Sequence, residues 1–285
     1  MAGRSRVEPR GCPSSQRTRG IFLEVEAMAD APVPAEPDPL AEARSHLEAG
    51  RPQEALRLLE PLVEREPTNA LAYQELARAL AELSRLGPAV RAARRALELD
   101  PSLARPHGVL AWVAVSQGRY EEALAEHRAQ LEALPEEDRE RRAAVHNNMA
   151  TCFFRMKRLE EARTSLQQAL ALDPERPTYR FNLAMLLLHL RQLEEAQAEL
   201  ERLLALPEVP PEIALAARFN LGHFCARQGR YGEARQHFLR AQEVRKTFPG
   251  WLYSRLPFLA RFPAYLLLVI LVAIALLLWN LFLRR

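Results

Sequence analysis

Three asparagines are the polar residues of this sequence whose spacing is best suited to binding a ligand through hydrogen bonds. Asn148, Asn182 and Asn220 stand 34 and 38 residues apart, at matching places in one repeating pattern. A side-chain amide both donates and accepts hydrogen bonds. We therefore expect these amides to form a ladder that binds the backbone of an extended polypeptide.

Other side chains follow the asparagines at the same spacing. They are Thr151, Met185 and His223, then Phe154 and Leu188, and finally Arg155, His189 and Arg227. The apolar members offer hydrophobic contact, and the row of cations favours a ligand with acidic side chains. The alternative reading is that the amides satisfy nearby backbone groups and that the arginines are simply solvated.

Groups that catalyse reactions or bind metals are not arranged for either purpose. The three cysteines, Cys12, Cys152 and Cys225, lack metal-ligand spacing, and the seven histidines are scattered. Phosphate-binding, nucleophile and metalloprotease patterns are absent from the sequence. The sequence therefore predicts buried, reduced thiols and a protein that is not an enzyme and uses no cofactor or metal.

A recurring small residue reveals the elements that position these side chains. An alanine returns every 34 to 39 residues, often with a glycine five residues before it and a proline twelve after it. Glycine can end a helix in the left-handed conformation, alanine lets two helices approach closely, and proline suits the start of the next helix. Each unit is therefore helix, turn, helix. The recurring alanines are Ala55, Ala89, Ala123, Ala162, Ala196 and Ala234.

This pattern resembles the tetratricopeptide repeat (TPR). The second copy reads ALAYQELARALAELSRLGPAVRAARRALELDP and matches the family through Tyr73, Ala77, Ala89 and Pro101, among others. The resemblance implies an all-α fold, a right-handed α-solenoid within residues 39–246 whose first helices line a concave wall. The expected repeats are residues 36–69, 70–103, 104–137, 143–176, 177–210 and 215–245.

Two connections between repeats are longer than the others. The charged residues 136–142 are expected to extend the following helix by about one turn. Residues 207–212 read PEVPPE, and so many prolines predict a loop.

The C-terminal part of the sequence has a different composition. Residues 264–283 read AYLLLVILVAIALLLWNLFL, with Asn280 as the only strongly polar side chain. At about 1.5 Å a residue, this length covers the roughly 30 Å hydrocarbon core of a bilayer. We expect a C-terminal transmembrane helix that contacts membrane lipid and resembles tail-anchored spans. Cations before the span favour a cytosolic repeat domain. A bacterial inner membrane is favoured, with the endoplasmic reticulum and the mitochondrial outer membrane as alternatives.

Two further segments flank the repeats. Residues 1–38 are rich in proline and lack helical periodicity, so we expect disorder there, and translation could start at Met1 or Met28. Residues 247–263 are apolar and interrupted by three prolines. This segment is expected either to cover the last repeat or to form an amphipathic juxtamembrane linker.

The net charge of the repeat region indicates which classes of partner are favoured. The net charge is +3, but the five cations after Arg245 and the excess of two cations in residues 1–27 leave about −4 for the rest. Such a surface argues against nucleic acid as a partner. The sequence favours a membrane-anchored, non-catalytic adaptor or scaffold that binds a protein or peptide. The alternative is a structural organiser or assembly factor of a membrane protein complex, and the oligomeric state stays open.

Overall fold

The computed structural model describes residues 38–245 and 248–257. Over these residues the chain is entirely helical apart from turns and loops. The helices are α2 (Pro39–Glu48), α3 (Pro52–Arg65), α4 (Ala70–Glu82), α5 (Leu86–Leu99), α6 (Ala104–Ser116), α7 (Tyr120–Ala133), α8 (Arg139–Arg155), α9 (Leu159–Leu172), α10 (Pro177–His189), α11 (Leu193–Leu204), α12 (Pro211–Arg227), α13 (Tyr231–Val244) and α14 (Phe248–Arg255).

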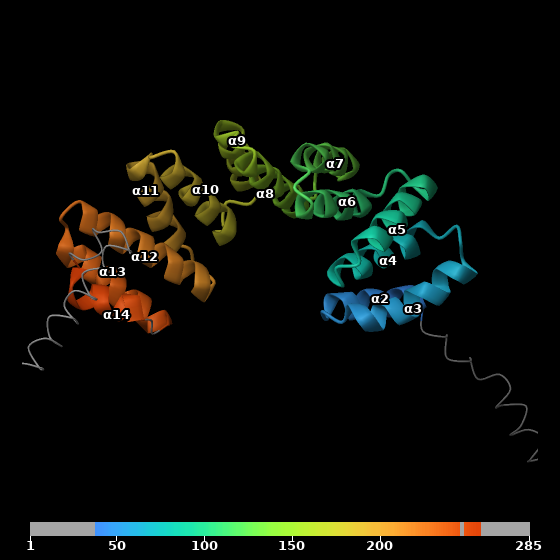
Figure 1. The fold of residues 1–285 in the computed structure, drawn as a ribbon, viewed down its shortest axis with the longest axis horizontal. Coiled ribbons are helices and arrows are strands. Elements are labelled where there is room, and N and C mark those ends of the chain that lie inside the picture. Colours follow the sequence, from blue (N-terminus) through green and yellow to red (C-terminus); the bar gives the residue numbers. More distant parts are fainter. Residues whose placement is uncertain (1–37, 246–247, 258–285) are drawn as a thin grey trace, which may run out of the picture.

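The helices from α2 to α13 form six consecutive pairs, each joined by a short turn. Figure 1 shows the pairs following one another around a curved arch, with α4, α6, α8, α10 and α12 nearer its inner side than their partners. Each pair contacts mainly the pairs next to it in sequence. The fold is therefore an α-helical repeat solenoid, as the repeat pattern predicted.

The recurring alanines lie where the two helices of each pair cross. All six are on second helices, and none is more than 1% exposed. A larger side chain at such a crossing would force the helices apart. The alanine period therefore marks the close contacts that hold each pair together.

The turn inside each pair has one backbone conformation. Gly50, Gly118 and Gly229 have φ angles of +67°, +74° and +79°. The amide of Gly118 donates to the carbonyl of Val115, and the next amide donates to the carbonyl of Ala114, which is the Schellman pattern of a helix end. Left-handed backbone ends the first helix, as expected from the glycines.

The other three turns reach the same conformation without glycine. Ser84, Lys157 and Arg191 have φ angles of 58°, 65° and 63°, and each stands five residues before its alanine. Residues with a Cβ atom rarely adopt this region. The sequence pattern did not reveal these strained positions, because it showed only where glycine was present.

The two longer connections have distinct structures. Helix α8 has 17 residues, against 13 for α4, α6 and α10, and the side chain of Asp138 caps it by accepting from the amide of Arg141. Residues 207–210 are not helical, and α12 begins at Pro211. The charged connection therefore lengthens α8, as predicted. The proline-rich connection forms a shorter loop than the predicted 207–212, because Pro211 and Glu212 already belong to α12, which also has 17 residues.

Helix α14 packs against the last pair. The ring of Tyr253 lies 5.2 Å from that of Phe238 and 5.0 Å from that of His223, measured between centroids. Arg235 also donates from Nε to the carbonyl oxygen of Ser254 at 3.2 Å. These contacts cover an apolar surface that the final repeat would otherwise expose to water.

Several sequence predictions concern residues that the structure does not describe. The expected transmembrane helix at 264–283 lies outside the described residues, as do Cys12 and the segment 1–38 expected to be disordered, apart from Asp38, which caps α2. Within the described residues, no helix has both the length and the apolar character needed to cross a bilayer.

Candidate functional site

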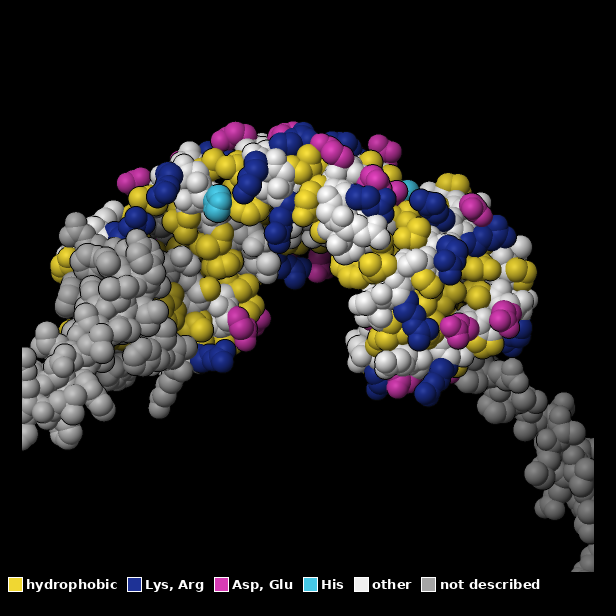
Figure 2. All heavy atoms as spheres, in the orientation of Figure 1, with side chains coloured by type: hydrophobic (Ala, Val, Ile, Leu, Met, Phe, Trp, Pro, Cys, Tyr) yellow, Lys and Arg dark blue, Asp and Glu magenta, His cyan; other side chains and the backbone are white. Residues whose placement is uncertain are grey.

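A pocket of about 420 Å³ opens between the inner helices α8 and α10. Figure 2 shows hydrophobic side chains reaching the surface along the inner side of the arch. Six of the predicted site residues line the pocket. They are Thr151, Phe154, Asn182, Met185, Leu188 and His189. The repeat spacing therefore brought together side chains from neighbouring first helices, as the sequence predicted for these six.

An amide pair forms the polar part of the pocket. Asn182 donates from Nδ2 to Oδ1 of Asn147 at 2.8 Å. Among the described residues, Nδ2 of Asn147 and Oδ1 of Asn182 have no hydrogen-bond partner. The pair therefore offers a ligand both a donor and an acceptor. Asn147 was missed by the sequence reasoning, and the signal that could have found it is its place one residue before Asn148.

Apolar side chains form the walls and floor of the pocket. The rings of Phe154 and His189 meet edge to face, with 5.0 Å between centroids and 74° between planes. Met185 lies on the same helix as His189, and the buried Ala162 and Leu166 of α9 also line the pocket. Such a cavity favours burial of one large apolar group.

Two members of the predicted amide ladder lie elsewhere. Asn148 is exposed and is not among the pocket residues. Asn220 donates from Nδ2 to the carbonyl oxygen of Ala216 at 2.9 Å, and it also approaches the sulfur of Met185 at 3.9 Å. The three predicted asparagines therefore do not line one pocket. Successive residues of a helix point about 100° apart, so Asn147 faces Asn182 and Asn148 does not.

The remaining predicted residues also lie away from the pocket. The ring of His223 contacts those of Phe238 and Tyr253, with 5.5 Å and 5.0 Å between centroids, and so belongs to the contact with α14. Arg155 and Arg227 are exposed and form no ion pair with another described residue. The cationic row predicted from the sequence therefore consists of separate surface side chains, and only His189 lines the pocket.

The thiols behind the inner surface are packed in the interior. Cys152 on α8 and Cys225 on α12 are buried and unpaired with each other. Burial raises the pKa of both thiols above the usual value, so the neutral forms are favoured. No group of potential metal ligands is found among the residues that the structure describes.

Comparison with known families gives one consistent result. Four family models, each described as a tetratricopeptide repeat, match residues 40–104, 102–175, 153–212 and 215–240. Together they span the six helix pairs. A comparison with curated protein sequences gave no match.

Several solved structures share the fold. One is YrrB, described as a TPR protein with an unusual peptide-binding site, at 22% identity and a TM-score of 0.53, covering 69% of this chain and 97% of YrrB. Another is PilF of Pseudomonas aeruginosa, at 22% identity and a TM-score of 0.60, covering 76% of this chain and 93% of that one. A third is MamA of Desulfovibrio magneticus RS-1, at 23% identity and a TM-score of 0.51, covering 60% of this chain and 97% of that one. These likenesses concern the fold.

Proposed function

We propose that this chain, which belongs to the tetratricopeptide repeat family, is a non-catalytic adaptor that binds an extended segment of a partner protein in the pocket between α8 and α10. The observation that carries the proposal is the unused donor and acceptor of the Asn147 and Asn182 pair, set beside apolar walls. Peptide backbone needs both kinds of hydrogen bond, and its side chains need apolar surface.

The pocket suits one large apolar side chain of such a segment. Its volume of about 420 Å³ lies in the range of pockets that bury small ligands. Phe154 and His189 supply ring edges, and Met185 supplies an adaptable thioether, a combination that accepts aromatic or long aliphatic groups. The similar fold of YrrB, described as having a peptide-binding site, supports a peptide as the class of ligand.

The partner's charge and the adaptor's location complete the proposal. Arg155 and Arg227 are exposed at the ends of α8 and α12, where they would favour acidic residues flanking the bound segment. The apolar residues 264–283 would anchor the chain in a membrane, with the repeats in the cytosol and a bacterial inner membrane favoured.

Peptide selection with a pocket-filling variant tests the binding site. Thr151→Trp places a large side chain at the exposed rim of the pocket, and Asn148→Trp places the same side chain on α8 outside it. Peptides selected from a random display library on the full chain should carry one large apolar residue. Their affinity should fall about 10-fold to 100-fold for Thr151→Trp, because filling the pocket removes the burial of that residue. Affinity should be unchanged for Asn148→Trp.

The outcome against the proposal is equally specific. Peptides that bind Thr151→Trp and the unaltered chain with equal affinity would place the binding surface elsewhere. The membrane part is tested by washing membranes with carbonate and comparing the full chain with a variant that ends at residue 246. Retention of the shortened variant would rule out residues 264–283 as the anchor.

A further inference from the structure

A second cavity, a groove between α4 and α6, lies on the inner side of the arch. It has a volume of about 520 Å³ and does not share any residue with the pocket between α8 and α10. Trp112 and Val109 form its apolar part, and Trp112 is 45% exposed although it is the largest type of side chain. An indole this exposed in a hollow offers apolar surface that a further segment can bury.

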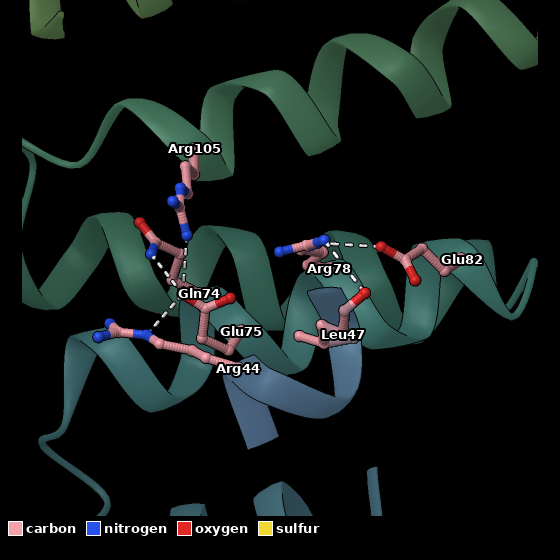
Figure 3. Close-up of polar contacts among 7 residues, drawn as sticks. All are labelled: Arg44, Leu47, Gln74, Glu75, Arg78, Glu82 and Arg105. Atoms are coloured by element: carbon pink, nitrogen blue, oxygen red, sulfur yellow. Dashed lines mark hydrogen bonds and ion pairs between the residues drawn. The ribbon is translucent and has the colours of Figure 1, made fainter. Parts of the chain in front are cut away.

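Cations on both helices border this groove. Glu75 is fully buried, and its Oε1 accepts from Nε of Arg44 and Nη1 of Arg105, each at 3.1 Å (Figure 3). Arg78 donates from Nε to Glu82 at 3.0 Å. Three guanidinium groups therefore share two carboxylates, which leaves one positive charge in excess. Arg78 and Arg105 line the groove together with Glu82, whereas Arg44 lies outside it. The groove therefore presents two guanidinium groups, each of which is already paired with one carboxylate.

Glu75 holds Arg105 by only one of its nitrogens. The side chain of Arg105 is 45% exposed, and within the described residues its other nitrogens make no hydrogen bond. A guanidinium has five donors in a rigid planar fork. Arg105 is therefore fixed in position yet retains donors for a carboxylate in the groove.

A segment of this same chain has matching chemistry and sufficient reach. Residues 21–28 read IFLEVEAM, which combines five large apolar side chains with Glu24 and Glu26 and stands out from the arginine-rich and proline-rich residues around it. The described chain begins at Asp38, which caps α2, and α2 contacts α4, which contacts α6. Ten residues extend to about 33 Å, whereas two helix spacings amount to about 20 Å.

We propose that residues 21–28 occupy the groove between α4 and α6 of their own molecule. The apolar side chains cover Trp112 and Val109, and Glu24 and Glu26 bind the cations at Arg105 and Arg78. Attachment through a short linker supplies an effective concentration of about 1 mM, so even a Kd of about 1 mM gives half occupancy. The groove and the pocket between α8 and α10 have no lining residue in common, so occupation of one does not require occupation of the other.

Photocrosslinking in the full chain tests the proposal. A benzophenone amino acid in place of Phe22 should crosslink to α4 and α6 within one molecule, identified by mass spectrometry of the monomer band. The double charge reversal Glu24→Lys with Glu26→Lys should reduce the crosslink by about threefold or more, because it replaces attraction to the arginines with repulsion. Glu8→Lys, a reversal outside the segment, is the matched control and should leave the yield unchanged.

A substitution at the exposed Trp112 gives an independent measurement without changing a buried side chain. Trp112→Ala should also reduce the crosslink, whereas Leu239→Ala, at a residue with the same 45% exposure on α13, should not. The proposal would be overturned if Phe22 crosslinked mainly to α8 and α10, or only to other molecules. It would also be overturned if neither the charge reversal nor Trp112→Ala changed the crosslinking yield. None of these results depends on whether the pocket between α8 and α10 binds a peptide.

Discussion

Replacing Gly118 with alanine should lower the free energy of unfolding by about 1 kcal/mol. Gly118 has a φ of +74°, and a Cβ built on it meets no atom within 4 Å. Steric clash with neighbours therefore contributes nothing, and the whole effect comes from the backbone. The left-handed conformation costs a residue with Cβ about 1–2 kcal/mol, and the stiffer unfolded chain returns about 0.4–1 kcal/mol.

Two further substitutions give this prediction its internal controls. Lys157→Gly removes a Cβ from the equivalent turn, at a φ of 65°, and should raise stability by up to about 1 kcal/mol. Gly232 lies exposed near the start of α13, without a positive φ and with nothing within 4 Å of a built Cβ. Gly232→Ala should therefore be neutral or stabilising by up to about 1 kcal/mol, because alanine favours helix.

Urea unfolding followed by circular dichroism measures these differences. At an m-value of about 2 kcal/mol/M, a change of 1 kcal/mol shifts the midpoint by about 0.5 M. An unchanged m-value would show that cooperativity is preserved, which repeat arrays do not always maintain. An unchanged midpoint for Gly118→Ala, or an equal fall for Gly118→Ala and Gly232→Ala, would contradict a cost that arises from the left-handed backbone.

Three further predictions concern packing and pH. Gly222→Ala should destabilise by about 1–3 kcal/mol despite the better helix former, because its Cβ would stand 2.6 Å from ring carbons of the fully buried Phe238; the urea midpoint measures this. Tyr253→Ala should remove about 2–4 kcal/mol of local stability and speed hydrogen exchange in α13, while exchange in α8 and α9 stays unchanged. Burial lowers the pKa of His127 below its ordinary value of 6.5, so the unfolded chain binds a proton on this side chain more readily than the folded chain does. The free energy of unfolding therefore decreases as the pH falls below about 6.5. Melting temperatures between pH 7.5 and pH 5 should therefore fall less steeply for His127→Gln, and identical slopes would contradict the assignment.

The repeat architecture could be predicted because its rules are local. Helix ends, close crossings and turns each depend on one residue type at a fixed place, as at Gly118 and Ala123. The rule failed for Lys157, whose conformation is imposed by the two helices it joins rather than by its own preference. Packing energy from both helices outweighs about 1 kcal/mol of local strain.

The candidate site was predictable only in part. The repeat spacing predicted that Phe154, Met185 and Leu188 lie on corresponding helix faces. In the structure all three line one pocket. It could not tell whether Asn147 or Asn148 faces Asn182, because that depends on how one helix is rotated against the next. A rotation of one residue position moves a side chain by about 100° around the helix.

The order of the paired helices, the period of the array and the alanines at its crossings can be read from the sequence alone, because each follows from contacts within one repeat. Three contacts became visible only in the folded chain: Asn147 pairs with Asn182, α14 packs on the last pair, and Glu75 binds Arg44 and Arg105 from two other helices. These contacts join different repeats, and their geometry depends on the curvature with which successive pairs stack.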